Sequence, residues 1–325
     1  MKGINVLSLF DGISCGRLAL NRANILINKY YASEINEYSI KITKKNFPDT
    51  IELGDVRKLK KETINEDIDL LIGGSPCQSF SFIGHMDGMS TNENGIKKEI
   101  LTLEEYLKAK NNGFEFNGFS YLFWEYVRLL NEVKPKFFLL ENVNMTKKWE
   151  NVITKALGVK PIRINSSLLS AQNRKRLYWT NLPIKGVPKD SNILLKSIFE
   201  DKKIYENVGE ALTVQRALPK LQKKYGYIPN MFNAYNATEI IDKSPTLSLG
   251  SMVTSSCATT LFIKDDKFGC YSVKNNKINI NNFEYDTKLK DGNYILRKLT
   301  PVECERLQNL PDNYTNGVSD SQRYK

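Results

Sequence analysis

The chain has 325 residues, a formal net charge of +11 and a pI near 9.2. This length can accommodate one large domain plus a smaller one, and the positive charge indicates a polyanionic partner, although charge alone only weakly indicates nucleic acid. The five cysteines and the single histidine lack metal-ligand spacing, so we expect no metal site. The sequence shows no signal peptide and no membrane-spanning stretch, so we expect a soluble, cytoplasmic protein.

The N-terminal half alternates predicted strands and helices. The strands share a short apolar run: 4–9, 25–32, 51–53, 69–72 and 137–140. The helices share helical periodicity and follow a turn or end before proline: one through 18–20, after the turn at 12–16, and two at 39–47 and 121–133. Strands separated by helices predict an α/β fold, with a doubly wound and mostly parallel sheet.

Polar groups follow the first three of these strands. Residues 10–16 form a glycine-containing loop, which suits a nucleotide but is also consistent with an ordinary strand-to-helix turn. Glu34 ends the second strand, where a carboxylate can bind both hydroxyls of a ribose. Asp55 follows the third strand, where it can accept a hydrogen bond from an adenine amino group. Three such groups in this order favour a cofactor pocket over three solvated charges.

A cysteine follows the fourth strand, in the run Gly73-Gly74-Ser75-Pro76-Cys77-Gln78-Ser79. The two glycines permit a tight turn, and Pro76 stiffens the approach to Cys77. Alone, this run fits either a nucleophilic thiolate at the carboxyl end of a sheet or a buried structural cysteine. The next strand ends in Glu141-Asn142-Val143, so an acid accompanies the cysteine and the nucleophile is favoured.

These motifs resemble those of the DNA cytosine-C5 methyltransferases, whose nucleophile motif is Pro-Cys-Gln and whose second motif is Glu-Asn-Val. The likeness runs from residue 4 to about residue 183 and resumes near residue 295. It implies a Rossmann-like fold that binds S-adenosylmethionine and a smaller target-recognition region that binds double-stranded DNA. By resemblance, the cofactor contacts are Phe10, Asp11, Gly12, Ile13, Glu34, Asp55, Val56, Pro76 and Leu122, with Phe10 against the adenine.

The resemblance also implies covalent catalysis. Cys77 attacks C6 of cytosine while Glu141 shares a proton with N3, and C5 then accepts the methyl group. Loss of the C5 proton expels Cys77. Neither ring atom is reachable in a stacked duplex, so the base is expected to flip out.

A basic motif, Gln172-Asn173-Arg174-Lys175-Arg176, matches the Gln-x-Arg-x-Arg element of the family. By resemblance, Arg176 reaches the cytosine O2 and Arg174 is a supporting or phosphate-facing group. The alternative is a solvated basic turn. Gln78, Ser79 and Asn142 complete the expected substrate contacts.

The rest of the chain is less specific. Residues 81–119, with a helix expected at 101–111, either close over DNA or form an insertion. We expect a catalytic domain over 1–183, a target-recognition region over 184–294 whose pattern Pro219 breaks, and a return segment over 295–325 that braces the catalytic domain. In the return segment, Thr300, Pro301 and Glu303 predict a capped helix start.

The chain stops at Lys325, before the Gly-Asn motif that completes the cofactor pocket in relatives. We therefore expect either a truncated chain or a second polypeptide that supplies this motif. The alternatives are a transfer-RNA cytosine-C5 methyltransferase of the same fold and an inactive DNA-binding relative. We expect the protein to act in a bacterial or phage-infected cell. Three origins stay open there: a restriction–modification system, a phage, or a solitary enzyme.

Overall fold

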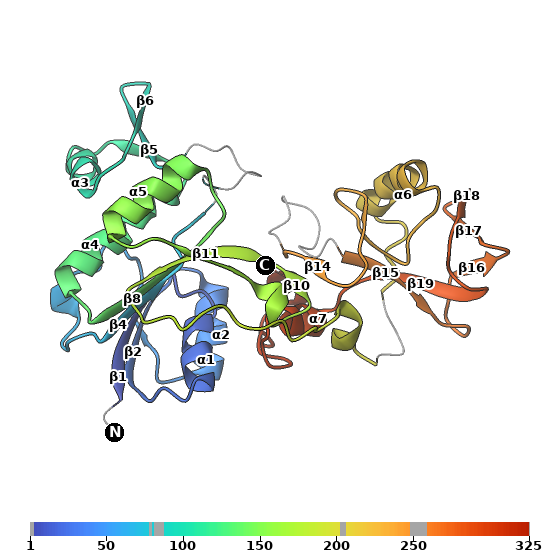
Figure 1. Ribbon diagram of the computed structural model, residues 1–325, viewed down its shortest axis with the longest axis horizontal. Coiled ribbons are helices and arrows are strands. Elements are labelled where there is room, and N and C mark those ends of the chain that lie inside the picture. Colours follow the sequence, from blue (N-terminus) through green and yellow to red (C-terminus); the bar gives the residue numbers. More distant parts are fainter. Residues whose placement is uncertain (1–2, 78–79, 81–87, 202–205, 248–258, 325) are drawn as a thin grey trace. The chain divides into compact units, whose positions relative to one another are not determined.

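The computed structural model describes residues 3–77, 80, 88–201, 206–247 and 259–324 (Figure 1). The chain forms two compact units. Unit 1 contains Met1–Asn165 and Lys175–Val187, and unit 2 contains Ser166–Arg174 and Pro188–Lys325.

Unit 1 is built around a seven-stranded sheet in the order β3-β2-β1-β4-β8-β11-β9. Its strands are β1 (Ile4–Leu9), β2 (Ile27–Ser33), β3 (Ile51–Glu52), β4 (Leu70–Gly73), β8 (Phe137–Val143), β9 (Ile162–Asn165) and β11 (Lys175–Thr180). The first five in the spatial order run parallel, whereas β11 is antiparallel to both of its neighbours. The predicted mostly parallel α/β sheet is confirmed.

Helices cover both faces of this sheet (Figure 1). They are α1 (Cys15–Arg22), α2 (Glu37–Asn46), α4 (Phe123–Val133) and α5 (Lys147–Leu157). Alternate strand residues enter two separate cores: Leu7 and Leu71 pack with residues of α4 and α5, whereas Val6 and Leu70 pack with Leu20 of α1. Because successive side chains of a strand point to opposite faces, apolar runs without alternation are what a doubly covered sheet requires.

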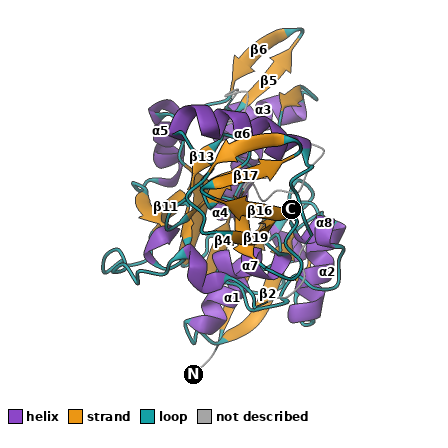
Figure 2. Cartoon of the chain, turned by 90° about the vertical axis from the view of Figure 1, so that its right-hand side faces the viewer, coloured by secondary structure: helices purple, strands orange, loops and turns teal. Residues whose placement is uncertain are grey.

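An additional structure follows the cysteine loop in unit 1. It consists of a three-stranded antiparallel sheet, β5 (Ser90–Glu93), β6 (Ile96–Glu99) and β7 (Glu115–Asn117), and helix α3 (Leu103–Asn111). The hairpin of β5 and β6 is seen at the top of Figure 2. The helix was expected at 101–111 and begins two residues later, because Thr102 and Glu105 form a capping box. The three strands were not predicted.

Unit 2 contains a second seven-stranded sheet, in the order β13-β12-β15-β19-β16-β17-β18. Its strands are β12 (Met231–Asn233), β13 (Thr238–Glu239), β15 (Thr259–Lys264), β16 (Tyr271–Lys274), β17 (Lys277–Ile280), β18 (Phe283–Asp286) and β19 (Gly292–Lys298). A short parallel pair joins β10 (Gln172–Asn173) to β14 (Ser244–Pro245), and the helices are α6 (Leu212–Tyr225), α7 (Pro301–Leu307) and α8 (Asp320–Arg323).

The structure differs from the expected division in two places. Residues 166–174 group with unit 2, and β19 lies inside the sheet of unit 2 between β15 and β16, so the segment expected as a separate return belongs to that unit's own core. Pro219 does not break the pattern as expected. It lies within α6, whose apolar side buries Val214, Leu218 and Leu221.

The predicted helix start at Thr300 is confirmed. The Thr300 hydroxyl accepts from the Glu303 amide, the Glu303 carboxylate accepts from the Thr300 amide, and Pro301 occupies the first turn. The same carboxylate is buried and accepts hydrogen bonds from both terminal nitrogens of Arg297, at 2.7 and 2.8 Å. This motif therefore contributes directly to the packing of unit 2. In the described residues, no helix combines the length and apolarity needed to cross a bilayer.

Candidate active site

The parallel strands of unit 1 bring the predicted site residues to one edge of the sheet. Strands β1, β2, β3, β4 and β8 run in the same direction, so the segments that leave their carboxyl ends gather at that edge. Ligands bind at this edge in open α/β sheets. The cysteine motif leaves β4, and the Glu-Asn-Val motif forms the last three residues of its neighbour β8.

The segment before Cys77 lies against the end of β8. A Cβ atom added at Gly74 would be 3.2 Å from Oε2 of Glu141, so the glycine lets the segment pass beside this carboxylate. The backbone carbonyl of Cys77 accepts from the amide of Phe80, whose ring is buried in the main core. Cys77 itself is half-buried. The nucleophile candidate is thus held at its backbone, three residues after the glycine that passes the acid candidate.

Glu141 and Arg176 form an ion pair across two antiparallel strands. The register pairs Arg176 of β11 with Val143 of β8, and Glu141 lies two residues before Val143 on the same face. Such diagonal neighbours are within reach of long side chains. Nε of Arg176 is 2.9 Å from Oε1 of Glu141, and the two side chains keep 13% and 29% of their surface exposed. The predicted acid and the predicted O2-binding arginine therefore meet, with surface left for a ligand.

Asn142 has a different environment from Glu141 because it points to the opposite face of β8. Its side chain is buried, and Nδ2 donates to the backbone carbonyl and the hydroxyl of Ser75, at 3.2 and 3.1 Å. Oδ1 accepts from the amide of Val143. These bonds fix the segment that precedes Cys77. Substrate binding by Asn142 stays a prediction.

We expect Asn142→Ala to slow methyl transfer and to lower the free energy of unfolding by about 1–3 kcal/mol, because Ser75 is left without its buried partner. Asn181→Ala is the control for position, since the exposed Asn181 makes two bonds at the other end of β8, to Phe138 and Lys136, and its loss should cost less stability. Denaturant unfolding and single-turnover rates measure both effects. If Asn142→Ala turns over at the wild-type rate, Asn142 does not support catalysis by fixing the segment before Cys77.

The loop after β1 is a tight turn next to Glu34. Phe10, Gly12 and Ser14 all have positive φ values, of 56°, 59° and 59°. A Cβ atom added at Gly12 would meet no atom within 4 Å, so this loop faces open space. Oε2 of Glu34 accepts from the Gly12 amide at 2.8 Å, and Oε1 accepts from the two amides that follow Glu34. The carboxylate is therefore oriented at the mouth of the loop.

Asp11 uses its side chain within the turn. The carboxylate accepts from the hydroxyls of Ser14 and Tyr30. Burial raises the pKa of the Asp11 carboxyl from its ordinary value, although hydrogen bonds from the surrounding hydroxyls oppose this shift. The side chain thus shapes the loop, and cofactor contacts by Asp11 and its neighbour Ile13 stay predictions.

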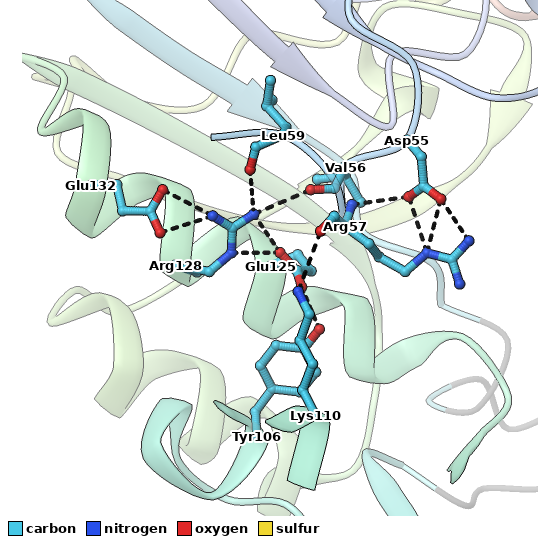
Figure 3. A network of polar contacts seen from close by, with 9 residues as sticks. All are labelled: Asp55, Val56, Arg57, Leu59, Tyr106, Lys110, Glu125, Arg128 and Glu132. Carbon is cyan, nitrogen blue, oxygen red and sulfur yellow. Dashed lines mark hydrogen bonds and ion pairs between the residues drawn. The ribbon is translucent and has the colours of Figure 1, made fainter. Parts of the chain in front are cut away.

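Asp55 follows β3 and is held by Arg57. The Arg57 guanidinium donates to both carboxylate oxygens, at 2.6 to 3.0 Å (Figure 3). These hydrogen bonds lower the pKa of the Asp55 carboxyl, which keeps it ionised as an acceptor. Val56 is buried in the main core of unit 1. Phe10 and Leu122 pack against this core and stay partly exposed. Sequence analysis missed Arg57, although an arginine two residues after the acid was a usable signal.

Three predicted residues are not placed in this site. Gln78 and Ser79 lie outside the described residues. Arg174 belongs to unit 2, whereas Arg176 belongs to unit 1. Pro76 lies beside Cys77 and is half-buried. Among the residues that the structure describes, no group of three or more histidine, cysteine or acidic side chains could hold a metal ion.

A doubly wound sheet with oriented carboxylates after β2 and β3 and a cysteine after β4 is a Rossmann-like fold with groups for a nucleotide cofactor and a nucleophile. The family model of C-5 cytosine-specific DNA methylases matches residues 4–325, and the chain belongs to this family. It is therefore a DNA cytosine methyltransferase, and S-adenosylmethionine is the methyl donor of the family. The open loop at Gly12 and the oriented carboxylates of Glu34 and Asp55 fit this cofactor.

Curated relatives agree with the family assignment. The chain is 27% identical over 339 residues to the type II methyltransferase M1.ScrFI of Lactococcus lactis subsp. cremoris, covering 98% of this chain and 72% of that protein. It is 34% identical over 191 residues to the orphan methyltransferase M.SPRI of Bacillus phage SPR, covering 55% of this chain and 37% of the relative. The match thus spans less than half the length of this phage relative.

Solved structures show the same fold. The chain aligns with the Entamoeba histolytica methyltransferase EhMeth at a TM-score of 0.58 and 16% identity, covering 100% of this chain and 92% of the other. A DNMT2 mutant of Spodoptera frugiperda aligns at a TM-score of 0.59 and 16% identity, covering 99% and 94%. At this identity the likeness concerns the fold alone and does not identify a substrate.

Proposed function

We propose that this chain transfers a methyl group from S-adenosylmethionine to C5 of cytosine in double-stranded DNA, through a covalent bond between Cys77 and C6 of a flipped base. The observation that carries the proposal is the 2.9 Å pair of Glu141 and Arg176 beside the Cys77 segment. A carboxylate and an arginine so arranged match the N3 and O2 edge of one cytosine.

The proposed chemistry assigns one task to each of the three residues. Sγ of Cys77, as thiolate, forms a bond to C6. The π electrons of the C5–C6 double bond shift to C5 and toward N3, and the ring becomes an enamine. Glu141 shares a proton with N3, and Arg176 donates to O2, so both stabilise the negative charge that this attack creates. When bound, S-adenosylmethionine would supply an electrophilic methyl group to C5, and its sulfonium sulfur would keep the electron pair of the broken bond and leave as a neutral thioether. A base then removes the C5 proton, the C5–C6 double bond re-forms, and Cys77 leaves.

Cofactor binding is proposed for the groups after the first three strands. Glu34 would accept from the ribose hydroxyls, Asp55 from the adenine amino group, and the ring of Phe10 would cover the adenine. The positions of Glu34 and Asp55 are supported by their hydrogen bonds to Gly12 and Arg57, which orient both carboxylates without a ligand. Such preorganisation reduces the entropy lost on binding.

We expect Glu34→Ala and Asp55→Ala to raise the Kd for S-adenosylmethionine by about 10- to 100-fold, the effect of losing one or two hydrogen bonds to a charged group. The Kd for DNA should change less than twofold. Glu99→Ala is the control, because Glu99 is an exposed carboxylate that pairs with Lys148. Calorimetry measures both affinities, and an unchanged cofactor Kd in both variants would remove these residues from the pocket.

Substrate recognition is proposed for unit 2, with lysine and arginine side chains on phosphates and other side chains on base edges. The net charge of +11 supports a duplex partner. We place the activity in the cytoplasm of a bacterial or phage-infected cell. Relatives are named both type II and orphan methyltransferases, so the proposed role lies in a restriction–modification system or as a solitary enzyme.

Bisulfite sequencing of DNA from cells that express the chain tests this function and reveals the target. We expect protected cytosines at one fixed sequence, and none when Cys77→Ser is expressed. Methyl transfer to transfer RNA without protection of DNA would replace the proposal by its transfer-RNA alternative. DNA binding without any methyl transfer would identify an inactive relative.

A further inference from the structure

A buried carboxylate on α4 joins three donors from two helices. Glu125 has no exposed surface, and it accepts from the hydroxyl of Tyr106, from Nζ of Lys110 at 2.5 Å and from Nε of Arg128 at 2.6 Å (Figure 3). A buried carboxylate is strongly unfavourable unless it is paired and hydrogen-bonded. Glu125 therefore fixes the side chain of Lys110, and it shares the guanidinium of Arg128 with Glu132, whose carboxylate accepts from Arg128 at 2.8 and 2.9 Å.

The two cations also bind backbone carbonyls of one short segment. Arg128 donates to the carbonyls of Val56 and Leu59, at 3.2 and 2.9 Å. Lys110 donates to the carbonyl of Arg57 at 3.3 Å. This segment, 56–59, directly follows Asp55 (Figure 3). Three of its carbonyls are thus held by groups that Glu125 helps to orient.

Side chains of the same segment hold it from the other side. Val56 and Leu59 are buried in the main core of unit 1. Between them, the Arg57 guanidinium binds both oxygens of the Asp55 carboxylate, while the Arg57 carbonyl accepts from Lys110. A continuous chain of contacts therefore runs from Glu125 through Lys110 and Arg57 to Asp55.

Helix α3 contributes to this network from the structure that follows the cysteine loop. Tyr106 and Lys110 lie one turn apart on α3, and the Tyr106 ring packs against the rings of Phe116 and Tyr121. Burial and the hydrogen bond to Glu125 raise the pKa of the Tyr106 hydroxyl, so it stays a donor. The helix is consequently fixed to α4 and not a loose insertion.

We propose that Glu125 is a positioning residue for the methyl donor. It holds Arg128 and Lys110 so that segment 56–59 presents Asp55 in the orientation that binds adenine, and α3 thereby supports the cofactor pocket. This inference rests on the proposed role of Asp55. Its consequence is that loss of the network weakens cofactor binding, while the chemical step at saturating cofactor is kept.

Glu125→Gln tests the proposal, because it keeps the size of the side chain and removes the charge. We expect the Kd and KM for S-adenosylmethionine to rise about tenfold, with kcat within about threefold and the DNA Kd within about twofold of wild type. Amide hydrogen exchange of residues 56–59 should accelerate before cofactor is added. Lys110→Met is a milder second variant, since this side chain is 34% exposed, and it should shift the same quantities in the same direction.

Glu150→Gln is the matched control. Glu150 is a buried carboxylate of unit 1 that pairs with Lys147 and Arg163, at 2.7 and 2.5 Å, and contacts no part of segment 56–59 in the contacts described here. We expect Glu150→Gln to lower the melting temperature without changing the cofactor KM. If Glu125→Gln and Lys110→Met behave like this control, the network is purely structural and the inference is wrong.

The test separates this inference from the function on which it rests. If Asp55→Ala binds S-adenosylmethionine like wild type, the assigned role of Asp55 fails. Hydrogen exchange in segment 56–59 still reports whether Glu125 holds that segment, because it needs no cofactor. If exchange is unchanged in Glu125→Gln while Asp55→Ala loses affinity, the proposed function stands and the positioning role is overturned.

Discussion

Cys77→Ser is expected to lower the methyl-transfer rate by at least about a thousandfold, the scale on which removal of a catalytic nucleophile acts. A serine hydroxyl is almost fully protonated at neutral pH, whereas a cysteine reaches its nucleophilic thiolate form. DNA and cofactor affinity should stay within about threefold of wild type, because the substitution changes one atom. Filter binding and single-turnover assays separate the two quantities.

A covalent trap tests the same residue by another route. Duplex DNA with 5-fluorocytosine at the target cannot release the C5 substituent as a proton, so the adduct with Cys77 should accumulate and migrate as a complex on a denaturing gel. Cys270→Ser is the control, because Cys270 is an exposed cysteine of unit 2. A trapped complex in Cys77→Ser, or its absence in an active wild type, would refute the covalent mechanism.

Glu141→Gln should have the second-largest effect, a fall in kcat of about 100- to 1,000-fold. The amide fills the same space but cannot share a proton with N3, and its loss of charge removes the ion pair with Arg176 that now spans 2.9 Å. Glu150→Gln serves as the control, since it also removes a carboxylate that pairs with an arginine of unit 1. Rapid-quench kinetics at saturating DNA and cofactor measure the step.

Arg176 offers a check on this assignment. Arg176→Lys keeps a positive charge but loses the planar group whose Nε contacts Glu141, so we expect a loss intermediate between wild type and Glu141→Gln. A Glu141→Gln enzyme that keeps at least half of the wild-type kcat would contradict the proposed acid role. The ion pair of Glu141 and Arg176 would then only stabilise the contact between β8 and β11.

The sheet could be predicted from sequence because its strands are short apolar runs with local boundaries. Strand β1 has the predicted bounds 4–9, and Glu34 follows the end of β2 as expected. The end of β8 was predicted too early. The strand continues through Glu141 to Val143 because β11 pairs with it there, and that partner lies more than thirty residues later. Long-range pairing of this kind leaves no local signal.

The details of the site depended on contacts that a motif does not encode. The cofactor contact of Asp11, implied by the resemblance, stays a prediction, and the motif gave no sign that its carboxylate accepts from Ser14 and Tyr30. The substrate contact of Asn142 also stays a prediction, and the motif did not indicate that strand alternation turns this side chain toward Ser75. The network of Glu125 was invisible for the same reason, since its donors come from α3 and its target is segment 56–59.

The division of the chain has a consequence for protein engineering. The backbone passes between the two units at residues 165/166, 174/175 and 187/188, so unit 2 is not one continuous stretch. A chimera that transplants only residues 188–325 would carry strand β14 without its partner β10, which stays with the host. Under the proposed role of unit 2 in recognition, an exchange of sequence specificity between relatives would require residues 166–174 to be transferred together with residues 188–325. A single crossover would separate the paired strands β10 and β14.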